Sequence, residues 1–194
     1  MVRVTSLWLV RHGRPQVDSA VPAADWPLAD PADPAVMALG EADVLPRHAR
    51  WVSSPEPKAT ATATVLRGAP VEVCRDLAEQ RRGVTWFDDP AYFADAVRRA
   101  ITRPEQAAVP GWEPAAEARR RVTAAVRRLL AGTFSDLVLV GHGTAWTLLV
   151  AELTEAEPDL TAWEAMAMPA LCALDMSSTP ARVAKPWRSV GPTS

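Results

Sequence analysis

The chain has 194 residues, of which 48% are hydrophobic and 23% are charged. This composition is typical of a soluble globular domain and excludes a disordered chain, a collagen-like repeat or a coiled coil. With 21 Lys and Arg against 23 Asp and Glu, the formal net charge is -2. Since non-specific nucleic-acid binding needs a strong basic field, we expect no nucleic-acid partner.

Cysteine usage and apolar runs bear on the compartment. Cys74 and Cys172 lie far apart and belong to no CxxC pair, which favours buried thiols in a reducing compartment over a disulfide framework. The longest early apolar run, Leu7–Val10, stops at Arg11, far short of a signal-peptide core or of the ~20 residues that cross a membrane. We expect a cytoplasmic protein with no membrane partner. No apolar stripe indicates its oligomeric state.

Short apolar segments alternate with helical ones along the chain. The alanine-rich segment Glu56–Leu66 predicts a helix that ends before Gly68. Ser53 or Ser54 is expected to cap this helix, with Pro55 near its first turn. Strands are expected at Val4–Val10, Ala49–Val52, Val71–Cys74, Leu137–Val140, Leu171–Asp175 and Arg182–Lys185.

The clearest helix is expected over residues 114–131, where apolar residues recur at helical spacing. Another helix is expected over Thr144–Leu153. Because the net charge is negative, we interpret the arginines of the first helix as a solvated face: Arg119, Arg120, Arg121, Arg127 and Arg128. The proline-rich stretches 22–34 and 104–114 are interpreted as loops.

This alternation predicts a three-layer α/β/α sandwich with a mostly parallel central sheet. No repeat or linker divides the chain, so we expect a single domain over residues 1–180. Prolines cluster again near the end, and residues 181–194 are expected to form a C-terminal tail.

Two apolar strands end in the same short signature. Arg11-His12-Gly13 follows the first strand, and Gly141-His142-Gly143 follows the strand at 137–140. Ligands of open α/β sheets bind beyond the carboxyl ends of the strands, so the two histidines are expected to meet in space. A tight turn explains one His-Gly pair; two such pairs, each closing a strand, indicate a site.

Further motifs extend this pattern. Their order along the chain is Leu9-Val10-Arg11-His12-Gly13, Ser53-Ser54-Pro55 with Lys58-Ala59 and Thr62-Ala63, Leu77-Ala78-Glu79, and Val140-Gly141-His142-Gly143. In these motifs, over roughly residues 4–155, the chain resembles the histidine phosphatase superfamily in its phosphoglycerate mutase-like branch. The resemblance implies that His12 is the nucleophile and becomes phosphohistidine, that Glu79 is the general acid, and that His142 also belongs to the catalytic set.

The chemistry of phosphate explains why these residue types are needed. A phosphomonoester carries about -1.5 to -2 charges, so its oxygens need positive donors. Arg11 offers a planar fork and His142 a ring nitrogen, while backbone N–H groups of Gly13 and Gly143 are expected to complete the cradle. His12 must attack as a neutral imidazole whose second nitrogen is held by a hydrogen bond. Burial would raise the pKa of Glu79 and nearby cations would lower it, which leaves its protonation state open.

Three positions depart from the family pattern. Lys58 stands where the family usually has arginine, so a point charge replaces a bidentate fork in phosphate binding. Asp18 stands where many members have asparagine; either its side chain points away from the phosphate or the alignment shifts in this loop. Pro15 follows Arg14 where a Glu-Thr pair is common. None of these removes the nucleophile.

The segment 80–113 contains a large share of the aromatic residues. In the family, the corresponding insertion shapes the substrate pocket. Aromatic walls and arginines for a second anionic group would then set substrate specificity, and the candidates are Arg81, Arg82, Trp86 and Trp112. The alternative is a satellite core beneath a loop.

The resemblance implies a metal-independent phosphatase that hydrolyses a small phosphorylated metabolite and needs no cofactor. A phosphomutase of the same family and a non-catalytic phospho-ligand or protein-binding module are the alternatives. A Cys-x5-Arg phosphatase is excluded, because Gln80 and Ser178 stand six residues after the two cysteines. The sequence has no P-loop, no GxSxG motif and no histidines at metal-ligand spacing.

Overall fold

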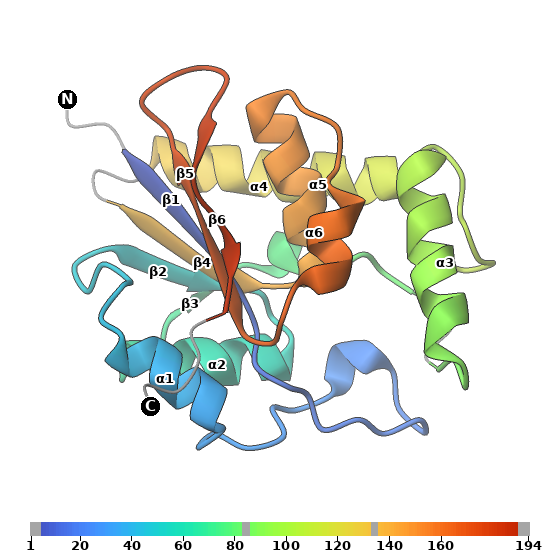
Figure 1. Ribbon diagram of the computed structural model, residues 1–194, viewed down its shortest axis with the longest axis horizontal. Coiled ribbons are helices and arrows are strands. Elements are labelled where there is room, and N and C mark those ends of the chain that lie inside the picture. The colour runs from blue at the N-terminus through green and yellow to red at the C-terminus, as the bar shows by residue number, and fades with distance from the viewer. Residues whose placement is uncertain (1–4, 83–85, 133–135, 190–194) are drawn as a thin grey trace.

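The computed structural model describes residues 5–82, 86–132 and 136–189, and a single sheet forms its centre. Its strands are β1 Ser6–Arg11, β2 Arg50–Ser53, β3 Glu72–Val73, β4 Leu137–Gly141, β5 Ala170–Asp175 and β6 Arg182–Arg188. They lie in the order β3-β2-β4-β1-β5-β6 (Figure 1). β3, β2, β4 and β1 run parallel, whereas β5 is antiparallel to both β1 and β6.

Helices cover both faces of this sheet (Figure 1). The α-helices of the described residues are α1 Pro34–Glu41, α2 Pro57–Arg67, α3 Pro90–Thr102, α4 Ala115–Ala131, α5 Gly143–Thr154 and α6 Leu160–Ala165. Side chains alternate between the faces of a strand: Leu7 and Leu9 of β1 pack toward α4 and α5, while Trp8 and Val10 pack toward α1 and α2. The expected three-layer α/β/α sandwich with a mostly parallel sheet is confirmed.

A third apolar cluster lies beside these layers. Trp112 packs there with buried residues of α3 and with the start of α4. The rings of Phe87 and Phe93 contact the Trp112 ring edge to face, with centroids 6.0 and 6.2 Å away. The segment 80–113 therefore does contain a satellite core. Its helix α3 lies next to the end of α4 that is farther from the sheet (Figure 1).

The predicted tail over 181–194 is wrong for residues 182–188, which form β6 and include the strand expected at Arg182–Lys185. Most side chains of β6 are exposed, so no pattern of buried residues in the sequence marks its extension to Arg188. The backbone pairs with β5 alone, and an edge strand tolerates a proline such as Pro186. Residues 190–194 lie outside the described residues.

The start of α2 also differs from the expectation. Pro57 rather than Pro55 occupies the first turn, and Glu56 is the N-cap residue without a capping side-chain bond. Ser54 Oγ instead accepts a hydrogen bond from the Glu56 backbone N–H at 3.3 Å. The helix ends as expected, at Gly68 with a positive φ of 71°.

Candidate active site

The register between two central strands brings the two predicted histidines together. Arg11 of β1 lies opposite Gly141 of β4, so the residues that follow, His12 and His142, emerge side by side at the same sheet edge. Their ring centroids are 5.2 Å apart with an interplanar angle of 63°. Both side chains are buried.

The hydrogen bonds of His12 fix its tautomer. Nδ1 lies 2.6 Å from the carbonyl oxygen of Gly13, and since a carbonyl only accepts, Nδ1 carries the hydrogen. Burial lowers the pKa of His12 well below its usual value, and the neighbouring His142 lowers it further. The ring is therefore neutral, with an unprotonated Nε2 that can act as a nucleophile.

His142 is held by the segment that precedes α2. Its Nε2 lies 2.6 Å from Ser54 Oγ and 3.3 Å from Glu56 Oε1. Burial lowers the pKa of His142 to about 3, against the opposing effect of Glu79. The ring is accordingly neutral at physiological pH.

Arg11 projects from the end of β1 across the start of α5. Its Nη1 donates a hydrogen bond to the carbonyl oxygen of Met166. A Cβ atom on Gly143 would lie 3.4 Å from Arg11 Nε, so the glycine leaves room for the guanidinium. Within the described residues, Arg11 Nε is buried without a hydrogen-bond partner.

The backbone N–H of Gly13, which was expected to contact phosphate, is used for another hydrogen bond. Its backbone N–H already donates to Thr62 Oγ1 at 3.0 Å, and that hydroxyl donates to the carbonyl of Lys58 at 2.7 Å. A Cβ at Gly13 would lie 2.6 Å from Val36 Cγ2. Gly13 thus allows close packing and orients His12 through its carbonyl.

Lys58 lies in the site but is paired with a carboxylate. Its Nζ is 2.5 Å from Glu56 Oε2 and 2.6 Å from the carbonyl oxygen of Ala23. The pair is nearly inaccessible, with 6% of the Lys58 side chain and 8% of the Glu56 side chain exposed. Burial raises the pKa of Glu56 although Lys58 opposes the shift. Glu56 was not among the predicted site residues, and its only signal in the sequence is its place two residues before Lys58.

Glu79 is an ionised carboxylate held by backbone donors. Its Oε1 accepts from the N–H groups of Gln80 and Ala145 at 2.9 and 2.8 Å, and Oε2 accepts from Thr144 at 3.1 Å. Burial alone would raise the pKa of Glu79, but Arg82, His142 and the backbone N–H groups of Gln80 and Thr144 outweigh burial and lower the pKa to about 2. This answers the question that the sequence left open.

One arginine of the expected solvated face turns inward and holds the segment before Glu79. Arg121 donates to the carbonyl oxygens of Asp76, Ala78 and Glu79 at 2.8 to 3.1 Å and pairs with Glu113 at 2.7 Å. Only 11% of its side chain is exposed. The interpretation of Arg121 as solvated is therefore wrong, because the carbonyls of this turn need donors.

The four specificity candidates have different surroundings. Arg82 lies inside the site, with Nη2 3.0 Å from Thr144 Oγ1. Arg81 is exposed and bonds Glu113 through its backbone N–H. Trp86 is half-exposed and meets Trp26 edge to face with centroids 6.4 Å apart. Trp112 is buried in the satellite core behind Arg82.

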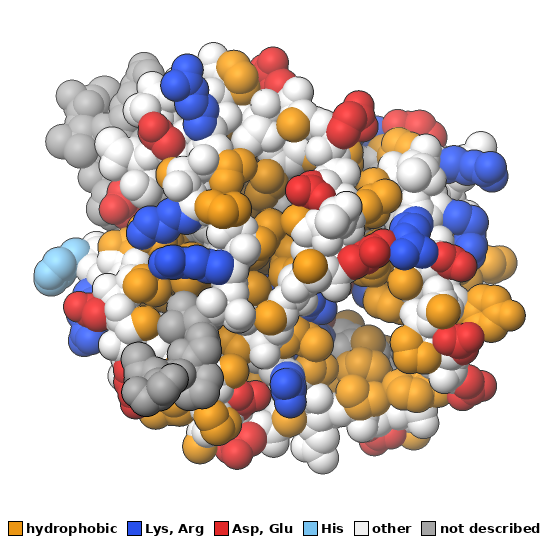
Figure 2. All heavy atoms as spheres, viewed as in Figure 1, with side chains coloured by type: hydrophobic (Ala, Val, Ile, Leu, Met, Phe, Trp, Pro, Cys, Tyr) orange, Lys and Arg blue, Asp and Glu red, His pale blue; other side chains and the backbone are white. Residues whose placement is uncertain are grey.

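The two histidines, Arg11, Lys58 and Glu79 line a cavity of about 910 Å³, together with Arg81, Arg82 and Trp86 but not Trp112. Figure 2 shows a hollow between the N-terminal loop and α3, with hydrophobic side chains around it. At its deep end both histidines are buried, whereas the aromatic side chains of its lining are partly exposed: Trp26, Trp86, Phe87, Phe93 and Trp163. Asp18 turns away, since its carboxylate accepts from the N–H of Ala20 in its own loop.

The described residues contain neither a candidate metal site nor a candidate membrane-spanning helix. No group of three or more His, Cys, Asp or Glu side chains in this part of the chain could hold a metal ion. None of the helices in the described ranges is long and apolar enough to cross a membrane.

Comparison with known proteins agrees with the geometry. The family model described as Histidine phosphatase superfamily (branch 1) matches residues 7–185. No curated protein matches the chain in sequence.

Three solved structures share the fold. Phosphoglycerate mutase from Bacillus anthracis str. Sterne has a TM-score of 0.74 at 18% identity, with 95% of this chain and 93% of that chain covered. Bacillus stearothermophilus YhfR has a TM-score of 0.72 at 20% identity, with 98% of each chain covered. The mycobacterial glucosyl-3-phosphoglycerate phosphatase has a TM-score of 0.68 at 24% identity, with 99% and 100% covered. Because the family match spans nearly the whole chain, this protein belongs to branch 1 of the histidine phosphatase superfamily.

Proposed function

We propose that the protein hydrolyses a small phosphomonoester without a metal ion, through a phosphohistidine on Nε2 of His12. The observation that carries the proposal is the hydrogen bond from His12 Nδ1 to the Gly13 carbonyl. It leaves Nε2 of a neutral ring as the nitrogen that can attack, at the deep end of a cavity that also contains Arg11 and Glu79.

The reaction has two steps. First, the lone pair of His12 Nε2 bonds to phosphorus while the ester P–O bond breaks, and the leaving oxygen takes a proton from Glu79. Second, water attacks the phosphohistidine, gives a proton to Glu79 and releases orthophosphate with His12 restored. Because the pKa of free Glu79 is about 2, Glu79 must take up its proton when the anionic substrate binds next to it, since a nearby negative charge favours the neutral acid.

The substrate class follows from the family and the cavity. Relatives named as a phosphoglycerate mutase and a glucosyl-3-phosphoglycerate phosphatase act on small phosphorylated metabolites, and we infer such a substrate here. The segment 80–113 supplies Arg82 and Trp86 to the cavity and is proposed to shape it. The free thiols Cys74 and Cys172 support a cytoplasmic location.

Phosphate release from para-nitrophenyl phosphate in excess chelator tests the proposal, with His12→Ala measured alongside. We expect chelator-resistant release that the variant loses, and an acid-labile phosphoenzyme in the unmodified protein. Release that persists in His12→Ala would exclude His12 as the nucleophile.

The same assay separates the alternatives. A mutase would transfer the phosphoryl group between isomers of a phosphorylated acid and release little phosphate. A binding module would bind phosphate esters but form no phosphoenzyme with any of them.

A further inference from the structure

Lys58 occupies the position where the family usually has arginine. Its positive charge is largely neutralised by the carboxylate that it pairs with. Two of the three N–H bonds of its ammonium face Glu56 and the carbonyl of Ala23. The ion pair is neutral overall, and Glu56 Oε1 is occupied in turn by the backbone N–H of Glu79 at 2.9 Å. A phosphate dianion at this point would meet a compensated pair rather than a free cation.

A second guanidinium enters the same cavity from the segment 80–113. The Arg82 guanidinium carbon lies 5.0 Å from the centroid of the Phe93 ring and 4.9 Å from that of Trp112. Such cation–π contacts hold a guanidinium in place and leave its N–H edge free for an anion. Only 15% of the Arg82 side chain is exposed.

The bonds of Arg82 show which of its donors are in use. Nη2 donates to Thr144 Oγ1 at 3.0 Å and lies 4.0 Å from Glu79 Oε2. Nε is buried and, over the described ranges, bonds to nothing. Arg11 Nε is in the same condition, and both arginines line the cavity that contains His12. Buried donors without a partner are rare in proteins, and two of them on arginines beside one cavity call for an explanation that a bound anion would supply.

We propose that Arg82, rather than Lys58, is the second phosphate-binding cation, so that Arg11 and Arg82 together hold the phosphoryl oxygens of a dianionic phosphomonoester. The inference rests on the proposed function and deepens it. Two guanidinium groups suit planar, bidentate contacts to phosphate, whereas Lys58 and Glu56 position the segment around His142.

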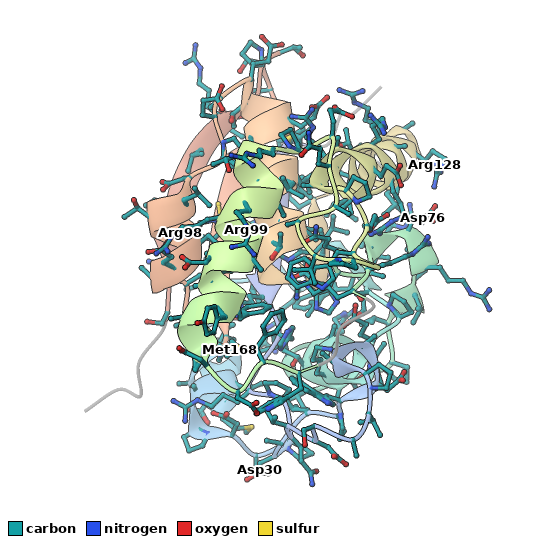
Figure 3. The ribbon with its side chains drawn as sticks, turned by 90° about the vertical axis from the view of Figure 1, so that its right-hand side faces the viewer. Asp30, Asp76, Arg98, Arg99, Arg128 and Met168 are labelled. Carbon is teal, nitrogen blue, oxygen red and sulfur yellow. The ribbon has the colours of Figure 1, made fainter. Side chains whose placement is uncertain are left out.

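Binding of inorganic phosphate, measured by isothermal titration calorimetry in excess chelator, tests this assignment without turnover. Arg82→Gln should raise the Kd at least about 10-fold, the loss expected for charge-assisted hydrogen bonds. Arg82→Lys should raise it several-fold, because the charge stays but the fork is lost. Arg99→Gln is the matched control: this exposed residue lies on α3 in the same segment (Figure 3), and its Kd should match the unmodified protein within twofold.

A double variant compares the two cations directly. Replacing the ion pair by apolar residues, in Glu56→Leu with Lys58→Met, should raise the Kd less than Arg82→Gln does. Circular dichroism and a cooperative thermal transition establish that each variant is folded. If Arg82→Gln does not fold, Arg82→Lys decides.

A folded Arg82→Gln, or Arg82→Lys in its place, that binds phosphate within twofold of the unmodified protein overturns the assignment. So does a double variant that loses as much affinity as Arg82→Gln. The proposed function fails separately: Arg82-dependent phosphate binding without any phosphohistidine would leave this binding site standing and remove the phosphatase.

Discussion

His12 and His142 lie 5.2 Å apart, ring to ring, because they follow residues that face each other across the β1–β4 ladder. Two buried imidazoles in this arrangement stay neutral, since a charge on either would be desolvated and would repel the cations nearby. This neutrality has a consequence for stability. An unfolded chain takes up protons on both rings near pH 6.5, whereas the folded protein does not.

Acidification should therefore destabilise the protein. A histidine whose folded pKa is lowered contributes stability that is present above its unfolded pKa and is lost as the pH falls toward the folded value. With the pKa of His142 at about 3, this residue alone should remove about 2 kcal/mol between pH 7 and pH 5. Glu56, with its raised pKa, acts in the opposite direction.

Urea unfolding at pH 7, 6 and 5 measures this loss, with His142→Asn as the comparison. Between pH 7 and pH 5, the free energy of unfolding should fall by about 2 kcal/mol less in the variant than in the unmodified protein. Equal slopes for both proteins would mean that His142 is protonated in the folded state.

Glu79→Gln should separate substrates by their leaving groups. Glycerol phosphate releases an alkoxide that needs a proton, so its turnover should fall about 100-fold or more. Para-nitrophenolate leaves without a proton, so that substrate should lose less than about 10-fold. Steady-state kcat/KM for both esters is the measurement, because it reports only the steps up to departure of the leaving group, and equal losses would argue that Glu79 positions the site rather than supplying the proton.

Much of this site could be predicted from the sequence, because strand endings and glycine turns are local signals. The two histidines and Arg11 were found in this way, whereas Glu79 was identified only through the resemblance to the family. Asp33-Pro34 and Asp89-Pro90 carried equally local signals: each aspartate caps a helix by accepting from the backbone N–H two residues on, at 2.8 Å. The proline-rich stretch 22–34 was interpreted as a loop, and the start of α1 at Pro34 was missed for that reason.

The charges around the histidines could not be predicted, because they depend on contacts between distant segments. Arg121 bonds the carbonyl of Glu79 from 42 residues away, and Arg82 reaches Thr144 across 62. No spacing rule links such pairs. The Glu56–Lys58 contact is local, yet its burial depends on the loop that brings Ala23 over it.

Removing one partner of the Glu56–Lys58 pair should lower the free energy of unfolding strongly, whereas replacing both partners by apolar residues should not. Glu56→Leu leaves a buried ammonium unpaired and should lower the free energy of unfolding by about 3–5 kcal/mol. Adding Lys58→Met should recover most of that loss, since apolar residues of similar volume often substitute well for a buried pair. Arg47→Ala, which breaks the exposed Arg47–Asp43 pair, should change stability by less than about 1 kcal/mol. Urea denaturation of the four proteins provides the comparison, and a double variant as unstable as Glu56→Leu would contradict this account.

Arg121→Ala should be far more harmful than Arg120→Ala, although the residues are neighbours on α4. Arg121 donates hydrogen bonds to three backbone carbonyls and to the Glu113 carboxylate. Its loss should lower the free energy of unfolding by about 3–5 kcal/mol. Arg120 is 64% exposed, and its truncation should stay within about 0.5 kcal/mol. Thermal and urea unfolding of both variants measure the difference. Similar stabilities would mean that water satisfies these carbonyls without Arg121.

Gly141→Ala should destabilise the end of β4 through a clash in the core. An added Cβ would lie 2.5 Å from Cζ2 of Trp146, and this ring cannot retreat easily, because it is fully buried and donates a hydrogen bond from Nε1 to the Val10 carbonyl at 2.9 Å. Overpacking of this kind costs about 1–3 kcal/mol. Since Gly141 precedes His142 and lies opposite Arg11, the shift should also lower turnover.

Gly40→Ala is the matched control for this change. Gly40 lies in α1, where the nearest atom to an added Cβ is Leu66 Cδ2 at 3.7 Å, an ordinary contact. Alanine should stabilise the helix there by about 0.5–1 kcal/mol. Urea unfolding should thus show that the free energy of unfolding falls for Gly141→Ala and rises for Gly40→Ala. An unchanged free energy of unfolding for Gly141→Ala would show that β4 can move away from Trp146.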